Sequence, residues 1–279
     1  MDLFISIGYK QSNVYIIPTS GVDGENLIED SKNLSWLTKK LFSPNNCLNS
    51  VTTLINAIDA IEIDPKPISL PLRIVIYVVF DTKKDNRALK GGAKVCGRIQ
   101  YGIIKRGMQI TIAPTNKTAA IKLIKKNHME VEVATAGDMV HLQISDVSPT
   151  DILPGHIISD ASNKPAKQCK SFTSQITFTD KRKYSNDINE GFKFQVHCHA
   201  VYFSCTLQKI YKKIDVNTGE TIDDNPKSIK GEETVIVEMV PAVQKAICIE
   251  KFDEFPSLSR FVVRKSNKLI GYGKITHIE

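Results

Sequence analysis

The residues best suited to metal chemistry in this sequence are His197, Cys198 and His199, three consecutive side chains of types that bind zinc. Adjacent side chains of a strand point to opposite faces, so Cys198 is expected to point away from both histidines. One ion held by all three is geometrically poor, and we predict an ordinary strand without a metal. Elsewhere no serine, cysteine and histidine have the spacing of a nucleophilic site, so the sequence predicts no catalytic residue.

Basic side chains offer a different chemistry, which is binding to polyanions. The formal charge of +7 is uneven: −3 over residues 1–66, +5 over residues 67–160 and +5 over residues 161–279. This excess suits a partner such as RNA, and the alternative is a basic surface that only keeps the protein in solution. Lys181, Arg182 and Lys183 fit a solvated loop better than a nucleic-acid contact. Arg98 either faces RNA or pairs with a carboxylate.

The elements that must position these residues are mostly short strands separated by turns. Met108, Ile110 and Ile112 alternate with more polar neighbours, and residues 105–107 before them predict a hairpin corner at Gly107. Such spacing indicates closed barrels or sandwiches. The predicted strands are residues 72–80, 94–101, 108–113, 118–126, 129–134, 139–147, 156–159, 169–179, 192–202, 204–214, 233–240, 245–250, 259–265 and 268–277.

Residues 1–66 have a mixed pattern. Residues 14–17 resemble a short strand, and residues 51–61 have helical spacing after Ser50, a suitable N-cap. These elements cannot enclose a core, so we expect the end of a domain that begins elsewhere. Pro65 and Pro67 predict an extended linker over residues 62–70. Residues 160–167 are polar and predict a second boundary.

Cysteine usage and hydropathy indicate the compartment. The six cysteines form no Cys-x-x-Cys pair, the first residues lack the basic and apolar regions of a signal peptide, and no apolar run approaches the roughly 18 residues of a membrane span. We therefore predict reduced thiols, a cytoplasmic location, no membrane association and a monomer.

A series of short motifs carries a resemblance to a known family. In the middle of the chain they are Gly97-Arg98, Gly102, Lys105-x-Gly107-Met108, Ala136-Gly137-Asp138-Met139-Val140 and Asp151-x-x-x-Gly155. Further on they are Cys198-His199-Ala200, Cys205, Lys213-Ile214-Asp215, Thr218-Gly219, Glu238-Met239-Val240-Pro241, Phe252-x-x-Phe255-Pro256 and Arg260-Phe261-x-x-Arg264. Near the start, they are Ile7-Gly8-Tyr9 and Pro18-x-Ser20-Gly21-x-x-Gly24-x-Asn26-Leu27. Their order resembles translation elongation factor 1-alpha, a translational GTPase.

The resemblance implies a mainly β fold. Two antiparallel β-barrels of the translation-factor domain II and III type follow the C-terminal remnant of an α/β P-loop GTPase domain. The implied domains are the remnant with its linker (residues 1–66), barrel domain II (residues 67–160) and barrel domain III (residues 161–279). The implied function is to bind aminoacyl-tRNA and deliver it to the ribosome when joined to a complete GTPase domain. The alternatives are the barrels of a paralogous release-factor or ribosome-rescue GTPase, and a truncated protein-binding module that binds no tRNA.

The nucleotide motifs of such a GTPase are missing from the 279 residues. They contain no Gly-x-x-x-x-Gly-Lys-Ser/Thr loop, no Asp-x-x-Gly switch and no Asn-Lys-x-Asp guanine reader. We therefore expect no GTP hydrolysis and no cofactor in this chain, and GTP with magnesium in a full-length relative. The partners that the resemblance implies are aminoacyl-tRNA, the ribosome, a guanine-nucleotide exchange factor and actin.

The resemblance also assigns candidate residues. Ser20 and Gly21 match the last guanine-contacting loop, and the alternative, which fits these two residues alone better, is an ordinary loop. Lys126 and His128 lie where the family borders the tRNA 3′ end, and Asn127 replaces the first histidine of the family's pair. The alternative for this turn is a solvated basic hairpin.

The third-domain candidates are Arg260 and Arg264. They would contact the RNA backbone or dock the GTPase domain, and the alternative is ion pairs between strands. Three other replacements alter contacts that the family makes. Tyr101 follows Gln100, which stands where the family has an acidic residue. Val133 follows Glu132, whose charge is one position earlier than in the family, and Ser259 replaces a glycine of the family.

Overall fold

The computed structural model describes residues 16–33, 53–61, 65–80, 92–179, 188–215, 218–242, 246–266 and 268–279. The chain divides into two compact units, Met1–Pro65 and Lys66–Glu279. In the described parts of the chain, no helix has the length and apolar character that spanning a membrane requires.

The described part of the first unit is a loop joined to a short helix, α2 (Leu54–Asp59). The N-cap of α2 is Thr53, whose side chain accepts a hydrogen bond from the Asn56 backbone amide, and not the predicted Ser50, which lies outside the described residues. Helix α2 is also tied to the loop, because the amide of Leu54 donates to the carbonyl of Asn26. Of the strand predicted over residues 14–17, residues 16 and 17 show no regular structure, and the other two lie outside the described residues.

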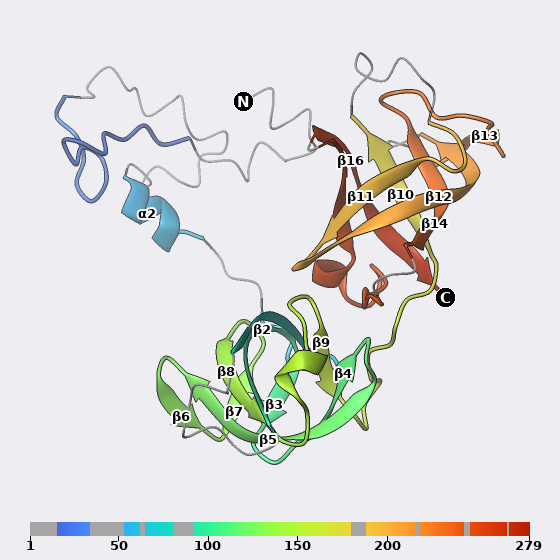
Figure 1. Cartoon of the computed structure of the whole chain (residues 1–279). Coiled ribbons are helices and arrows are strands. Elements are labelled where there is room, and N and C mark those ends of the chain that lie inside the picture. The colour runs from blue at the N-terminus through green and yellow to red at the C-terminus, as the bar shows by residue number, and fades with distance from the viewer. Residues whose placement is uncertain are drawn as a thin grey trace. The chain divides into compact units, whose positions relative to one another are not determined.

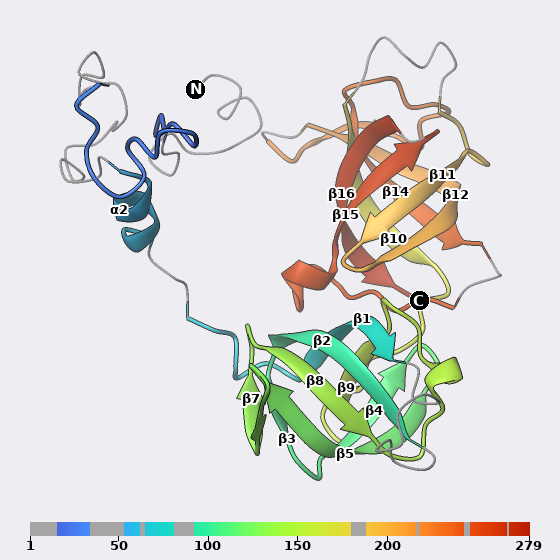
Figure 2. The same cartoon turned by 60° about the vertical axis from the view of Figure 1, so that its left-hand side comes forward.

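The second unit begins with a closed barrel, which we call barrel one (teal to yellow-green in Figures 1 and 2). Its elements are β1 (Arg73–Phe80), β2 (Ala93–Tyr101), β3 (Ile103–Lys105), β4 (Gln109–Ala113), β5 (Lys117–Lys126), β6 (Met129–Val131), β7 (Val133–Thr135), β8 (Met139–Ile144), the 3-10 turn η5 (Pro149–Asp151) and β9 (Ile157–Asp160). Strands β4, β9, β1, β2, β8 and β5 pair in that order, and a β4–β5 pairing closes the ring. Alternate apolar residues of these strands fill the interior.

The turn at residues 105–107 is real, but the predicted hairpin across it is wrong. Strand β3 pairs with β7, whereas β4 pairs with β5 and β9. A second turn at Gly102 redirects the chain before β3 begins. Gly102 has a φ of +79°, and an added Cβ would lie 2.7 Å from the Leu72 backbone. The strand predicted over residues 129–134 likewise divides, into β6 beside β5 and β7 beside β3.

Barrel two occupies the rest of the second unit (yellow to red in Figure 1). Its elements are β10 (Phe172–Phe178), β11 (Lys193–Cys198), β12 (Val201–Ile214), β13 (Thr221–Asp224), β14 (Thr234–Pro241), the 3-10 turn η6 (Pro256–Leu258), β15 (Arg260–Lys265) and β16 (Lys268–Ile278). Strands β11, β15, β16, β10, β14 and β12 form a ring that a β11–β12 pairing closes. No strand forms over residues 246–250, where Ile247 makes a single bridge to Cys169, and residue 245 lies outside the described residues.

A small apolar cluster joins the two barrels within the second unit. It includes Val75 and Tyr101 from barrel one and Phe255 and Leu258 from barrel two. The Tyr101 ring meets the Phe255 ring edge-on at 5.1 Å between centroids. Both the backbone amide and the hydroxyl of Ser257 donate hydrogen bonds to the Tyr101 hydroxyl, at 2.9 and 2.8 Å. Tyr101, which the sequence analysis noted only as the residue after a lost acidic contact, therefore anchors this junction.

Candidate nucleic-acid interface

The first candidate region lies at the turn between β5 and β6 in barrel one. Lys126 and Met129 pair across the hairpin, so Asn127 and His128 form a two-residue turn. Both have positive φ values, +49° and +68°, as a type I′ hairpin requires. Asparagine tolerates this conformation well, and histidine less so. The turn leaves the His128 ring exposed to solvent.

Lys126 is held by a buried carboxylate. Its Nζ lies 2.9 Å from Oδ1 of Asp138, and Nζ of Lys66 lies 3.8 Å from the same oxygen. The Thr135 amide donates to the other carboxylate oxygen at 3.0 Å. Burial by itself raises the pKa of Asp138, but the Thr135 amide and the two lysines outweigh it, so the pKa lies below its ordinary value. Because the Lys126 side chain is still 40% exposed, the ion pair orients it without hiding it from a ligand.

Arg98 projects from the outer face of barrel one, while its neighbour Ile99 points into the core. In register it lies between Val75 of β1 and Met139 of β8. Arg98 is exposed, and no carboxylate among the described residues pairs with it. The structure therefore shows no such ion pair for Arg98 among the described residues, and its contact with RNA stays a prediction.

The glutamate that moved by one position also has a defined place. Glu132 lies between β6 and β7, and its Oε1 is 3.1 Å from Nη1 of Arg106. Both side chains are exposed, so this ion pair contributes little to stability. The following residue, Val133, is exposed as well.

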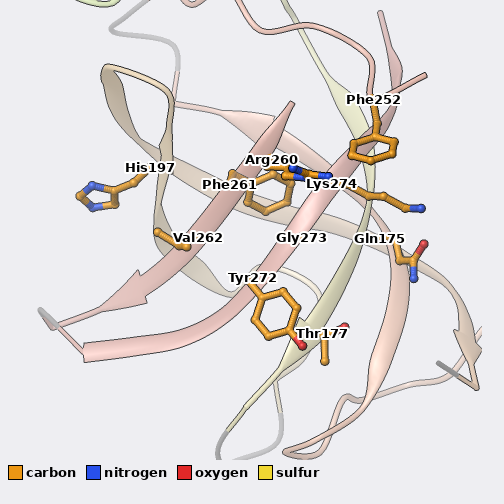
Figure 3. A pocket seen from close by; sticks show the side chains of 10 residues that line it. All are labelled: Gln175, Thr177, His197, Phe252, Arg260, Phe261, Val262, Tyr272, Gly273 and Lys274. Atoms are coloured by element: carbon orange, nitrogen blue, oxygen red, sulfur yellow. The ribbon is translucent and has the colours of Figure 1, made fainter. Parts of the chain in front are cut away.

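The second candidate region is on barrel two, where Arg260 of β15 lies directly opposite Lys274 of β16. Both cations lie over the ring of Phe252, with Cζ of Arg260 5.2 Å and Nζ of Lys274 4.9 Å from its centroid. These three side chains line a groove of about 430 Å³ (Figure 3). Gln175, Thr177, His197, Val262 and Tyr272 also line this groove.

Arg264 does not line this groove. It is half-buried near the end of β15 and pairs in register with Gln195 of β11. A bulge between Val263 and Arg264 interrupts the register with β16. The structure thus separates Arg264 from Arg260, although the sequence places them together.

Ser20 and Gly21 lie in the loop of the first unit. The Ser20 hydroxyl donates to a carboxylate oxygen of Asp23 at 2.8 Å and accepts from the Asp23 amide at 3.2 Å. These bonds define a local turn. Gly21 is exposed, and a Cβ added there would meet no atom within 4 Å. The local fold alone therefore does not require glycine at this position.

His197 and Cys198 of the His-Cys-His run point to opposite faces of β11, as the strand geometry predicts. Cys198 is buried in the core and its thiol points to the Leu258 carbonyl, whereas the His197 ring stacks on Tyr202 at the outer face. His199 follows in the turn after β11, and its Nε2 lies 3.1 Å from the Cys248 carbonyl. Burial lowers the pKa of His199 to about 4, so this ring is neutral at physiological pH. Among the described residues, no three metal-binding side chains are grouped as ligands.

Comparison with known proteins adds independent information. Residues 171–276 match the family model described as "GTP-eEF1A C-terminal domain-like". The chain is 32% identical to elongation factor 1-alpha of Aspergillus oryzae over 274 residues, which is 98% of this chain and 57% of that protein. It is 33% identical to elongation factor 1-alpha of Tetrahymena pyriformis over its whole length, covering 59% of that relative.

The chain is a homologue of elongation factor 1-alpha. It spans somewhat more than half the length of these relatives. The crystal structure of Sup35 complexed with GDP has the same fold over 99% of this chain and 62% of the Sup35 chain, with a TM-score of 0.66 and 20% identity. The predicted mainly β fold with two antiparallel barrels is confirmed.

Three site features of this elongation factor 1-alpha homologue were missed in the sequence. Asp138 was noted only as part of a motif, Phe252 likewise, and Lys274 was not singled out. Lys274 and Tyr272 are two residues apart on one predicted strand and therefore share a face, which could have marked Lys274 as an outward cation. The basic run at residues 181–183 lies outside the described residues.

Proposed function

We propose that this chain carries the aminoacyl-tRNA-binding barrels of an elongation factor 1-alpha relative. In this proposal the barrels deliver aminoacyl-tRNA to the ribosome when they are joined to a complete GTPase domain. The observation that carries it is the set of exposed or half-exposed cations on rigid strands, above all Arg98, which no described carboxylate neutralises. The family relationship supplies the kind of ligand.

Backbone contacts suit a carrier of many different tRNAs. Such a carrier must recognise phosphates, 2′-hydroxyls and shape, because the base sequence differs from one tRNA to the next. In the proposal Arg98, Lys126 and His128 border the 3′ end that bears the amino acid. Arg260 and Arg264 of the second barrel contact the RNA backbone.

The proposed domain organisation follows the same relationship. Residues 1–66 would be the end of a GTPase domain with its linker, residues 67–160 barrel domain II and residues 161–279 barrel domain III. Ser20 and Gly21 would then lie near the guanine of a bound nucleotide. GTP, magnesium, an exchange factor, the ribosome and actin would be ligands and partners of the complete factor.

Electrophoretic mobility shift with aminoacyl-tRNA tests the proposal. The full chain is titrated at low salt, alone and with a separately supplied elongation factor 1-alpha GTPase domain. We expect a shift that Arg98→Gln weakens and that Lys105→Gln, an exposed lysine elsewhere on barrel one, leaves unchanged. Absence of a shift under both conditions would count against tRNA binding.

A second candidate, a module that binds proteins, is favoured by exposed apolar side chains on the same barrel. Met129, Val133 and Met139 each expose about half or more of their surface. If the exchange factor binds the chain while aminoacyl-tRNA does not, this candidate replaces the first.

A further inference from the structure

Two like charges face each other on the outer surface of barrel two. Arg260 and Lys274 are directly opposite residues of β15 and β16, an arrangement that destabilises a sheet when nothing offsets it. The Phe252 ring offsets part of the repulsion, because its face attracts both cations. No carboxylate lines the groove, and none among the described residues pairs with either cation. The pair is therefore suited to an anion that lies between the two side chains.

A row of rings lies beside these cations on the same face. Tyr272 of β16 is opposite Val262 of β15, Val262 is opposite His197 of β11, and His197 is opposite Tyr202 of β12. Tyr272 is 49% exposed and Tyr202 60% exposed. The His197 and Tyr202 rings stack with centroids 5.7 Å apart and planes 22° from parallel. Figure 3 shows Tyr272 and His197 at the groove, with Arg260, Lys274 and Phe252 grouped together.

The spacing of the two rows fits one class of ligand. Tyr272 and Lys274 are two residues apart on β16, about 7 Å along the strand. Exposed rings beside a line of cations form the kind of surface on which bases stack while phosphates are neutralised. We propose that this face of barrel two is a binding site for single-stranded RNA, with phosphates at Arg260 and Lys274 and bases on the Tyr272–His197–Tyr202 row.

Single-stranded RNA fits this face better than a duplex or a peptide strand does. The bases of a duplex are stacked on one another and do not offer their faces to the rings. A peptide cannot extend the sheet here, because β10, β16, β15 and β11 are each paired on both sides. Recognition therefore depends on side chains alone, and the two cations together with the Gln175 amide offer hydrogen-bond donors to phosphate oxygens.

The inference shares Arg260 with the proposed function but does not depend on tRNA delivery. The two are distinguished by Arg98→Gln on barrel one, which should weaken aminoacyl-tRNA binding and leave binding of a short single strand unchanged. Oligonucleotide binding without aminoacyl-tRNA binding would support this site and overturn the proposed function. Aminoacyl-tRNA binding without oligonucleotide binding would overturn this site.

Fluorescence anisotropy with a labelled oligouridylate of about ten nucleotides tests the site on the full chain. Tyr272→Ala should weaken binding by about 5- to 150-fold, and Tyr272→Phe, which keeps the ring, should restore it. Arg260→Gln and Lys274→Gln should each reduce the slope of log K against log salt by about 0.7. Lys209→Gln is the matched control, since Lys209 is exposed on barrel two and lies over the Tyr211 ring outside the groove.

Three results would overturn the inference. The first is the absence of binding at low salt. The second is an equal loss of binding in Lys209→Gln, which would indicate attraction to the general positive charge. The third is displacement of the oligonucleotide by polyglutamate as effectively as by unlabelled single strand, which would assign the face to an acidic protein. Circular dichroism of each variant confirms that the barrels remain folded.

Discussion

The ion pair between Arg73 and Glu250 gives the sharpest stability prediction. The Arg73 side chain is 1% exposed, and its Nε lies 2.5 Å from Oε1 of Glu250 across the junction of the two barrels. Its Nη1 donates to the Leu72 carbonyl at 2.9 Å, and its Cζ lies 4.3 Å from the centroid of the Phe255 ring. Removing either partner leaves the other charge buried, at a cost of about 3–5 kcal/mol. Arg73→Met and Glu250→Leu should each lower the free energy of unfolding by that amount.

The double variant should behave differently. Burial raises the pKa of Glu250, and the attraction of Arg73 does not fully offset it, so the carboxylate gains little from being charged here. Replacing both residues by apolar ones should therefore change the free energy of unfolding by less than about 1 kcal/mol. In a unit of this size, each single variant should lose about 6–20 °C in Tm, and the double variant should recover most of it.

The pH dependence separates the two single variants. In Arg73→Met the carboxyl of Glu250 has lost its partner, and its folded-state pKa is raised. The stability of this variant should therefore increase as the pH falls and decrease as the pH rises through that pKa. Glu250→Leu leaves a guanidinium that does not titrate, and acid should not rescue it. Urea unfolding monitored by circular dichroism at several pH values measures all three variants. Single-variant losses below 1 kcal/mol would refute the reasoning, because they would mean that the pair is hydrated.

Three further predictions concern single sites. Gly155→Ala should lower the free energy of unfolding by about 3 kcal/mol, because φ is +90° and the new Cβ would lie 2.8 Å from Cβ of Val201. Gly107→Ala has a φ of +80° but open space around the new Cβ, so its loss should be only about 1 kcal/mol. Urea unfolding measures both. Asp138→Asn should cost about 1–2 kcal/mol at pH 7, and since the folded-state pKa is lowered, the difference from wild type should shrink as the pH falls through that pKa, below its ordinary value of 3.8. Among the described cysteines, half-buried Cys96 should react first with iodoacetamide in mass spectrometry, while Cys198, whose pKa burial raises to about 12, should react only on unfolding.

Local patterns predicted the strands well where one face is buried. Residues 94–101 were predicted as a strand, and in the structure β2 alternates, with Ile99 inside barrel one and Arg98 outside it. Strand β13 was missed because its four residues are all exposed and show no alternation. The helix was placed correctly but its N-cap was not, because the sequence offers several hydroxyl residues before α2 and only the backbone geometry distinguishes Thr53.

Pairing between distant elements could not be predicted from local patterns. Alternation describes one strand at a time and does not reveal that β3 pairs with β7 and not with β4. Tyr101 and Phe255 meet because two closed barrels pack together, which no local spacing indicates. The register of β15 and β16 is a related case. Counting back from their tight turn would place Arg260 opposite Gly273, and only the bulge shifts it to Lys274.

The salt dependence of aminoacyl-tRNA binding tests the central claim most directly. Filter binding of the full chain is compared with a variant that combines Arg98→Gln, Lys126→Gln and Arg260→Gln, over a range of salt concentrations. If these three cations contact the RNA backbone, the slope of log K against log salt should become shallower by about 2–3, with weaker binding at low salt. An unchanged slope would contradict the account, because it would show that the RNA binds elsewhere on the molecule.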